Sequence, residues 1–116
     1  MIQSRAVGNR GEDLACTFLK KLGYRILERN FTIRGGEIDI IALEGSDLVF
    51  VEVKARFSSE YGLAREAVTP WKLRALQKSA LFYIQQIKWG DKPYRFDLVA
   101  IDYRDGKPQI ELLKNI

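Results

Sequence analysis

The sequence predicts an α/β fold in which helices flank a central mixed β-sheet. Three observations support this: β-branched or alternating runs recur in five segments, apolar residues recur at helical spacing in two longer segments, and one of these helices separates the third strand from the fourth. A helix between strands is typical of a crossover, whereas short turns are typical of hairpins. We therefore expect the order α-β-β-β-α-β-β in a single domain spanning residues 1–116.

The first predicted helix spans residues 6–22 and ends before Gly23, a stop signal. Gly8 and Gly11 are costly in a helix, which indicates close packing or the close approach of a ligand. An irregular start, with the stable helix beginning near Gly11, is the alternative. Cys16 lies in the apolar pattern, and we expect it to be a small buried residue. The helical spacing is carried by Val7, Leu14, Ala15, Phe18, Leu19 and Leu22.

Three strands are predicted next, over residues 24–32, 36–42 and 48–54. The last two flank a short turn and form a hairpin, in which paired residue numbers sum to about 91. In this register Asp39 faces Glu52 and Glu37 faces Lys54. Two facing carboxylates repel each other, and a bound divalent cation would reverse the sign of that interaction. A bulge would instead place Asp39 diagonal to Glu52.

The second half of the chain begins with an exposed loop over residues 55–68, which we expect to contact a substrate. Thr69 and Pro70 then provide an N-cap and a first helical residue, and the helix is predicted to run to about Lys88. Two further strands are predicted, over residues 94–103 and 109–113, joined by a tight turn.

Composition excludes several classes of protein. Hydrophobic residues make up 47% of the chain and charged residues 29%, which is typical of a globular domain. There is no histidine, so the usual general base and zinc ligand are missing, and chemistry would depend on carboxylates, lysine and hard cations such as Mg²⁺. A single cysteine and the absence of a long apolar run predict a cytoplasmic protein without a membrane partner.

The net charge of +4 is unevenly distributed. Residues 54–95 carry nine basic and three acidic side chains, so this segment alone is +6, whereas both flanking segments carry one excess acid. A basic segment beside an acidic pocket suits an enzyme that acts on a polyphosphate. The alternative is that these lysines and arginines only solvate a helix.

The acidic residues are weak signals singly, since Glu12 could interact with the helix dipole and Glu37 could pair with Lys54. Together, an acid on the first helix, Asp39 on one strand and Glu52-x-Lys54 on the next resemble the PD-(D/E)xK nuclease superfamily. This resemblance implies a restriction-endonuclease-like fold. Ile38 stands where the superfamily name has proline, at a position that varies.

The resemblance extends to the YraN-like family of uncharacterised bacterial proteins, which is similar to archaeal Holliday-junction resolvases. It covers nearly the whole chain. The matching motifs are Gly8-x-x-Gly11-Glu12-x-x-Ala15, Gly36-Glu37-Ile38-Asp39, Val51-Glu52-Val53-Lys54-Ala55-Arg56, Tyr61-Gly62 and Arg95-Phe96-Asp97.

The resemblance implies hydrolysis of DNA, with branched or junction DNA as one substrate class, assisted by Mg²⁺ or Mn²⁺. Asp39, Glu52 and the Val53 carbonyl would bind the cation, and Glu12 would complete the site. Lys54 would orient water or stabilise charge on phosphorus, with Glu37 as its supporting partner. Candidates for nucleic-acid contact are Arg56, Tyr61, Lys72, Arg74 and Lys78.

Two other functions stay open at this point. One is a nucleic-acid-binding module whose acidic pocket is vestigial, and the other is a structural or interaction protein in which these charges form internal ion pairs. A homodimer is an alternative that the sequence does not decide.

Overall fold

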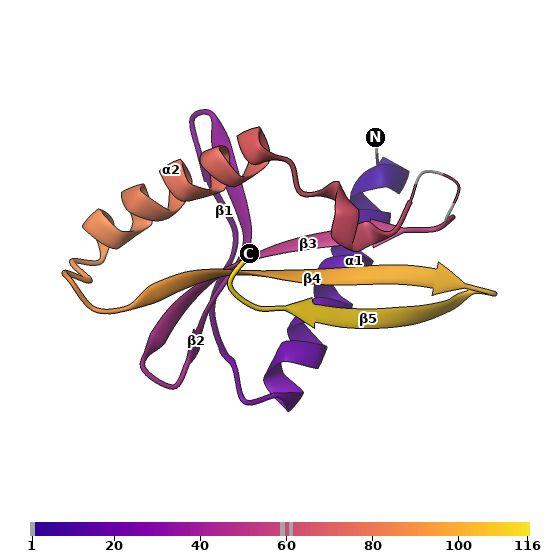
Figure 1. The fold of residues 1–116 in the computed structure, drawn as a ribbon, viewed down its shortest axis with the longest axis horizontal. Coiled ribbons are helices and arrows are strands. Elements are labelled where there is room, and N and C mark those ends of the chain that lie inside the picture. Colours follow the sequence, from indigo (N-terminus) through magenta and orange to yellow (C-terminus); the bar gives the residue numbers. More distant parts are fainter. Residues whose placement is uncertain (1, 59, 61) are drawn as a thin grey trace.

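The computed structural model describes residues 2–58, 60 and 62–116, and side chains from residue 10 onward. It has two α-helices, a short 3₁₀ helix and five strands (Figure 1). In chain order the elements are α1 (Ile2–Lys21), β1 (Arg25–Ile33), β2 (Gly36–Glu44), β3 (Asp47–Arg56), η1 (Ala64–Ala67), α2 (Pro70–Gln86), β4 (Tyr94–Arg104) and β5 (Lys107–Leu113).

The strands form one mixed sheet in the spatial order β1-β2-β3-β4-β5. The pair β3 and β4 is parallel, and the other three neighbouring pairs are antiparallel. The segment that connects β3 to β4 contains η1 and α2, which is the predicted helical crossover. The fold class and the order of helices and strands are therefore confirmed, and the arrangement is consistent with a restriction-endonuclease-like fold.

Central strand β3 is covered on both faces, as its apolar pattern predicts. Val49 and Val51 pack in the core cluster that contains Leu19 of α1. Phe50, which points to the other face, packs in the cluster that contains Tyr83 of α2. Each helix thus buries its apolar stripe against a different face, and Cys16 is buried in the α1 layer as expected.

Local signals in the sequence account for most element ends. The Thr69 hydroxyl accepts a hydrogen bond from the Lys72 backbone N–H at 3.3 Å, which caps α2 where the sequence predicts. The β2–β3 hairpin turns at Gly45, whose positive φ of 59° suits glycine. The structure differs from prediction at α1, which begins at Ile2, and in the predicted loop, where η1 forms against β3 and β4.

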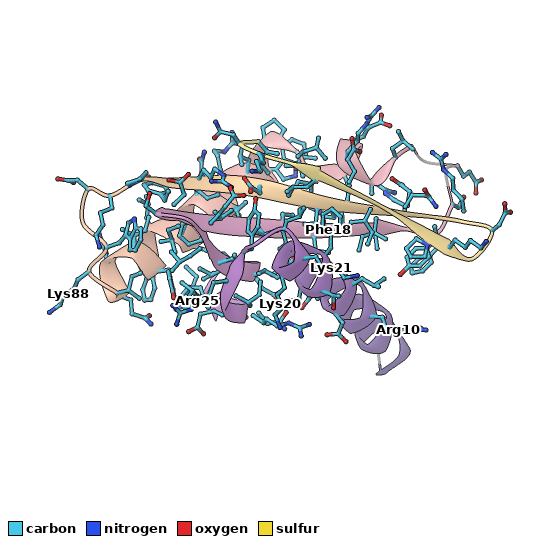
Figure 2. The ribbon with its side chains drawn as sticks, turned by 90° about the horizontal axis from the view of Figure 1, so that it is seen from below. Arg10, Phe18, Lys20, Lys21, Arg25 and Lys88 are labelled. Carbon is cyan, nitrogen blue, oxygen red and sulfur yellow. The ribbon has the colours of Figure 1, made fainter. Side chains whose placement is uncertain are left out.

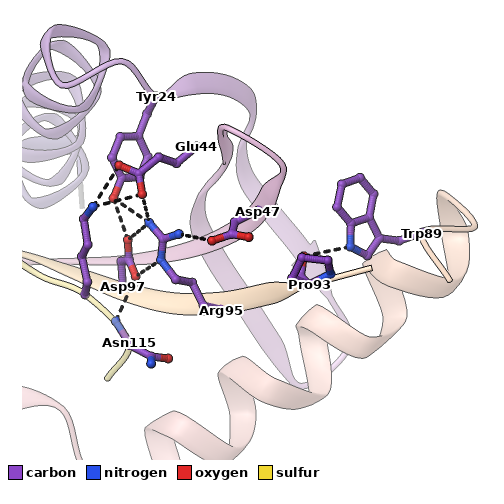
Figure 3. A network of polar contacts seen from close by, with 9 residues as sticks. Tyr24, Glu44, Asp47, Trp89, Pro93, Arg95, Asp97 and Asn115 are labelled. Carbon is purple, nitrogen blue, oxygen red and sulfur yellow. Dashed lines mark hydrogen bonds and ion pairs between the residues drawn. The ribbon is translucent and has the colours of Figure 1, made fainter. Parts of the chain in front are cut away.

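A buried polar network closes the end of the sheet near the β2–β3 turn (Figure 3). Asp97 is fully buried and accepts hydrogen bonds from the Tyr24 hydroxyl at 2.8 Å and from Arg95 Nε at 3.1 Å. Arg95 also pairs with Glu44 and, at 2.7 Å, with Asp47. Every carboxylate in this network has a cationic partner, which is what makes burial of the group tolerable.

Candidate metal centre and nucleic-acid interface

The candidate site lies where β2 and β3 stop pairing. Their antiparallel register runs from Glu44 opposite Asp47 to Ile40 opposite Val51, so paired numbers sum to 91 as predicted. Beyond this point the Val53 backbone N–H donates to the Asp39 carboxylate at 2.8 Å. The side chain of Asp39 thus replaces a strand partner, and the sheet forks there: β1 and β2 diverge from β3, β4 and β5 (Figure 1).

Asp39 and Glu52 come together at this fork. Burial is the largest cause that raises the pKa of Glu52, and the adjacent Asp39, by sharing a hydrogen bond and by its charge, raises it further, to about 8. The charges of Lys54 and Lys72 act in the opposite direction. The raised pKa of Glu52 favours its protonated form near neutral pH, and in that form Glu52 can donate a hydrogen bond to Asp39.

Glu12 approaches the same fork from α1. Burial and the charge of Asp39 raise the pKa of Glu12, while the Asn30 side chain and the charge of Arg29 lower it. Glu12 Oε1 is buried and has no hydrogen-bond partner within the described residues. The nearest Arg29 nitrogen is 3.8 Å away, and Arg29 makes its closer contact, 2.8 Å, with Asp13. An unpartnered buried carboxylate oxygen is costly and suits a cation or a water ligand.

Two lysines complete the charge distribution. Lys54 is on β3, two residues after Glu52 and therefore on the same face. Lys72 is in the first turn of α2, and contact with Lys54 is the largest cause that lowers its pKa, followed by partial burial. The charges of Glu52 and Asp39 raise the pKa of Lys72, which places both lysines beside the carboxylate pair.

The other predicted residues are more dispersed. Glu37 is exposed and lies opposite Thr32 of β1, because the pairing of β2 with β3 ends before it could reach Lys54. Arg56 lines a small cavity of about 170 Å³ at the far end of β3. Arg74 and Lys78 are exposed on α2. Tyr61 lies outside the residues that the structure describes.

The residues present fit a hard divalent cation. The donors are carboxylate oxygens: those of Asp39 and Glu52, which lie together, and Oε1 of Glu12, which lacks a partner. Across residues 10–58, 60 and 62–116, no three His, Cys, Asp or Glu side chains are gathered closely enough to enclose a metal ion. A cation bound by Asp39 and Glu52 would therefore keep several waters, as Mg²⁺ usually does.

The contribution of Asn30 to this site was not predicted from the sequence. Asn30 has a positive φ of 54°, which is unusual outside glycine, and its side chain reaches Glu12. An asparagine within a strand pattern is the one local signal for such a kink. Lys72 was expected to contact a nucleic-acid backbone, and its position beside Lys54 depends on how α2 docks, which no local pattern reveals.

No helix in the described part of the chain is both long enough and apolar enough to cross a membrane.

Comparison with known proteins finds uncharacterised relatives. The sequence model described as "Uncharacterised protein family UPF0102" matches residues 11–101. A UPF0102 protein of Geobacter metallireducens is 45% identical over 114 residues, covering 98% of this chain and 93% of the relative. Relatives from Geotalea daltonii and Caldicellulosiruptor saccharolyticus are 48% and 46% identical, covering 97% and 98% of this chain and 89% and 98% of their own. None of these names states an activity.

Proposed function

This chain belongs to the uncharacterised protein family UPF0102, the YraN-like family that its motifs predict, and we propose that it is a metal-dependent nuclease that hydrolyses phosphodiester bonds in DNA. One observation carries the proposal. Asp39 and Glu52 lie together where the sheet forks, Lys54 and Lys72 lie beside them, and Glu12 approaches from α1 with one unpartnered oxygen. Carboxylates that bind a cation next to lysines that bind phosphate are the parts that this reaction requires.

Asp39 and Glu52 would hold Mg²⁺ or Mn²⁺, with Glu12 linked through water. The Val53 N–H holds the Asp39 carboxylate in one orientation at 2.8 Å, so this ligand is positioned before the cation arrives. Participation of the Val53 carbonyl stays a prediction. When bound, the cation would lower the pKa of a coordinated water and offset negative charge on the phosphate.

The two lysines would act on the phosphate itself. Charge accumulates on the phosphoryl oxygens as the nucleophile attacks, and Lys54, two residues from Glu52 on the same strand face, is placed to stabilise it. Lys72 would supply a second donor from the first turn of α2. Because burial and the neighbouring Asp39 raise the pKa of Glu52 to about 8, cation binding should displace the Glu52 proton and tighten as pH rises toward 8.

A second candidate function is a nucleic-acid-binding module that does not cut. The observation that favours it is the incomplete ligand set, since no three acidic side chains of the described residues enclose a cation. Both candidates predict binding that weakens steeply with salt, and only the first predicts cleavage.

Cleavage assays on end-labelled duplex, flap, four-way-junction and single-stranded DNA, each with Mg²⁺, Mn²⁺ or EDTA, separate the two candidates. We expect metal-dependent products from the wild type and a loss of at least about 100-fold in Asp39→Asn and Lys54→Ala, with DNA binding in EDTA retained. Asp91→Asn, an exposed change in the α2–β4 turn, is the matched control. The parallel preparation of Asp39→Asn also reports any contaminating nuclease.

Absence of cleavage on every substrate, by a folded preparation that binds DNA, would leave the second candidate. Equal cleavage by the wild type and Asp39→Asn would show that Asp39 at the fork takes no part in the reaction. A folded preparation that neither binds nor cuts would contradict both candidates.

A further inference from the structure

A groove of about 480 Å³ runs along the outward face of α2, beside the tip of the β1–β2 hairpin. The helix residues that line it recur at helical spacing, so they form one stripe about 16 Å long. Ile33, at the end of β1, lies on the hairpin side. The stripe consists of Arg74, Gln77, Lys78, Leu81, Phe82 and Gln85.

The groove combines apolar and basic groups. Leu81 and Phe82 are 52% and 53% exposed, respectively, although they lie next to each other and to Ile33. The ring of Phe82 packs against the ring of Phe31, with 6.5 Å between the two ring centroids. The ionisable groups that line the groove are Arg74 and Lys78, and both are cationic. Surfaces that bind single-stranded nucleic acid combine exposed aromatic rings, on which bases stack, with cationic side chains that bind the phosphates. The groove has both kinds of group.

A second copy of this chain is a poorer occupant. A two-fold contact through the groove would bring the same patch of both copies together, so the Arg74 and Lys78 side chains of both copies would be enclosed in one interface. Like charges across an interface are costly, and the groove offers no acid of its own to pair with them. A strand of nucleic acid, by contrast, supplies negative charge at every residue.

The groove lies on the same helix as Lys72, on another side of it. Lys72 stands beside Lys54 in the first turn of α2, and Arg74, two residues later, is about 3 Å farther along the helix axis and turned about 200° around it. A strand that passes around the first turn of α2 would connect the site with Arg74, and along the groove it would then meet Lys78 and the exposed ring of Phe82.

We propose that this groove binds an unpaired segment of the DNA substrate, with a base stacked on Phe82 and its phosphates on Arg74 and Lys78. The inference rests on the proposed function, since it names the substrate class of that same site. Bases within a duplex are stacked on each other and cannot lie on Phe82, so the groove selects DNA in which a single strand adjoins the cut.

The test is equilibrium binding in EDTA, measured by fluorescence anisotropy with a labelled oligothymidine strand and with a labelled blunt duplex of equal length. We expect Phe82→Ala to weaken binding of the single strand by about 5- to 150-fold and to leave the duplex unaffected. Phe82→Tyr, which keeps a ring, should restore binding. Lys78→Ala should reduce the slope of log affinity against log salt by about 0.7, whereas Lys88→Ala, an exposed lysine beyond the groove, should not. Figure 2 shows Lys88 at the opposite end of the molecule from Arg10 of α1.

Three outcomes would overturn the proposal. Folded Phe82→Ala could bind the single strand with wild-type affinity, or its affinities for the single strand and the duplex could fall equally. The third outcome is a wild-type dimer in sedimentation that Phe82→Ala abolishes. The last would assign the groove to self-association. Circular dichroism confirms folding of each variant. Cleavage is not a readout of this test, so failure of the nuclease proposal and failure of the groove proposal remain distinguishable.

Discussion

Replacing Glu52 by glutamine should make the protein more stable at alkaline pH. In the folded state the Glu52 carboxyl has a pKa of about 8, against an ordinary value of 4.5, because burial and Asp39 disfavour its ionised form. Between these two values the folded state keeps a proton that the unfolded state has released. Stability therefore falls as pH rises from about 4.5 to about 8, and is constant above that range.

The size of the effect follows from the shift. Each pKa unit corresponds to about 1.4 kcal/mol, so a shift from 4.5 to about 8 sets an upper limit of about 5 kcal/mol. Glu52 is only partly buried, so solvent screens its charge, and we expect Glu52→Gln to gain about 2 kcal/mol at pH 9 and little at pH 5. Glutamine does not ionise, and its amide can still donate a hydrogen bond to Asp39.

The assay is urea unfolding at a series of pH values in EDTA, with Asp91→Asn as the control for loss of one exposed negative charge. The difference between wild type and Glu52→Gln should grow from about pH 4.5 to about pH 8 and then level off, while the curve for Asp91→Asn should parallel the wild type. Added Mg²⁺ should restore stability to the wild type at pH 9 and not to Glu52→Gln. Parallel curves for wild type and Glu52→Gln would refute the buried carboxylate pair.

Three further predictions concern the scaffold and the charged surface. Tyr24→Phe removes the hydroxyl that donates to buried Asp97 at 2.8 Å and should lower the free energy of unfolding by about 1–3 kcal/mol, measured in urea. Gly36→Ala should destabilise the protein because a Cβ there would overlap Ser79 Oγ, and combination with Ser79→Ala should recover most of the loss in a double-mutant cycle. DNA affinity in EDTA should fall linearly on a log–log plot against salt, and a flat response would contradict a phosphate-binding surface.

The strands and the α2 cap could be predicted because their causes are local. Alternation identified β3, and Thr69 with Pro70 fixed the start of α2. The pairing sum of 91 followed from a two-residue turn, and it is confirmed as far as Ile40 opposite Val51.

The fork itself has no such local cause. Gly36 packs against Ser79 of α2, and Gly11 of α1 lies close to Ala55 near the end of β3, so a helix packs against each branch of the sheet beyond the point where the β2–β3 pairing ends. Their separation ends the β2–β3 ladder before Glu37, which leaves Glu37 opposite Thr32. Only the docking of both helices determines this, and a strand-by-strand prediction that extends the register past Asp39 cannot include it.

Two acidic clusters in the same chain differ in how far their negative charges are compensated. Around Arg95, the carboxylates of Glu44, Asp47 and Asp97 are all bonded to cations, and Lys114 adds a second positive charge. Those bonds lower the pKa of Glu44, so that cluster is stable with its acids ionised. At the fork the pKa of Glu52 is raised despite two nearby lysines, and a Glu12 oxygen stays unpartnered. The same compensation at the fork would stabilise the protein, and acids that are less fully compensated there are what the proposed cation site would require.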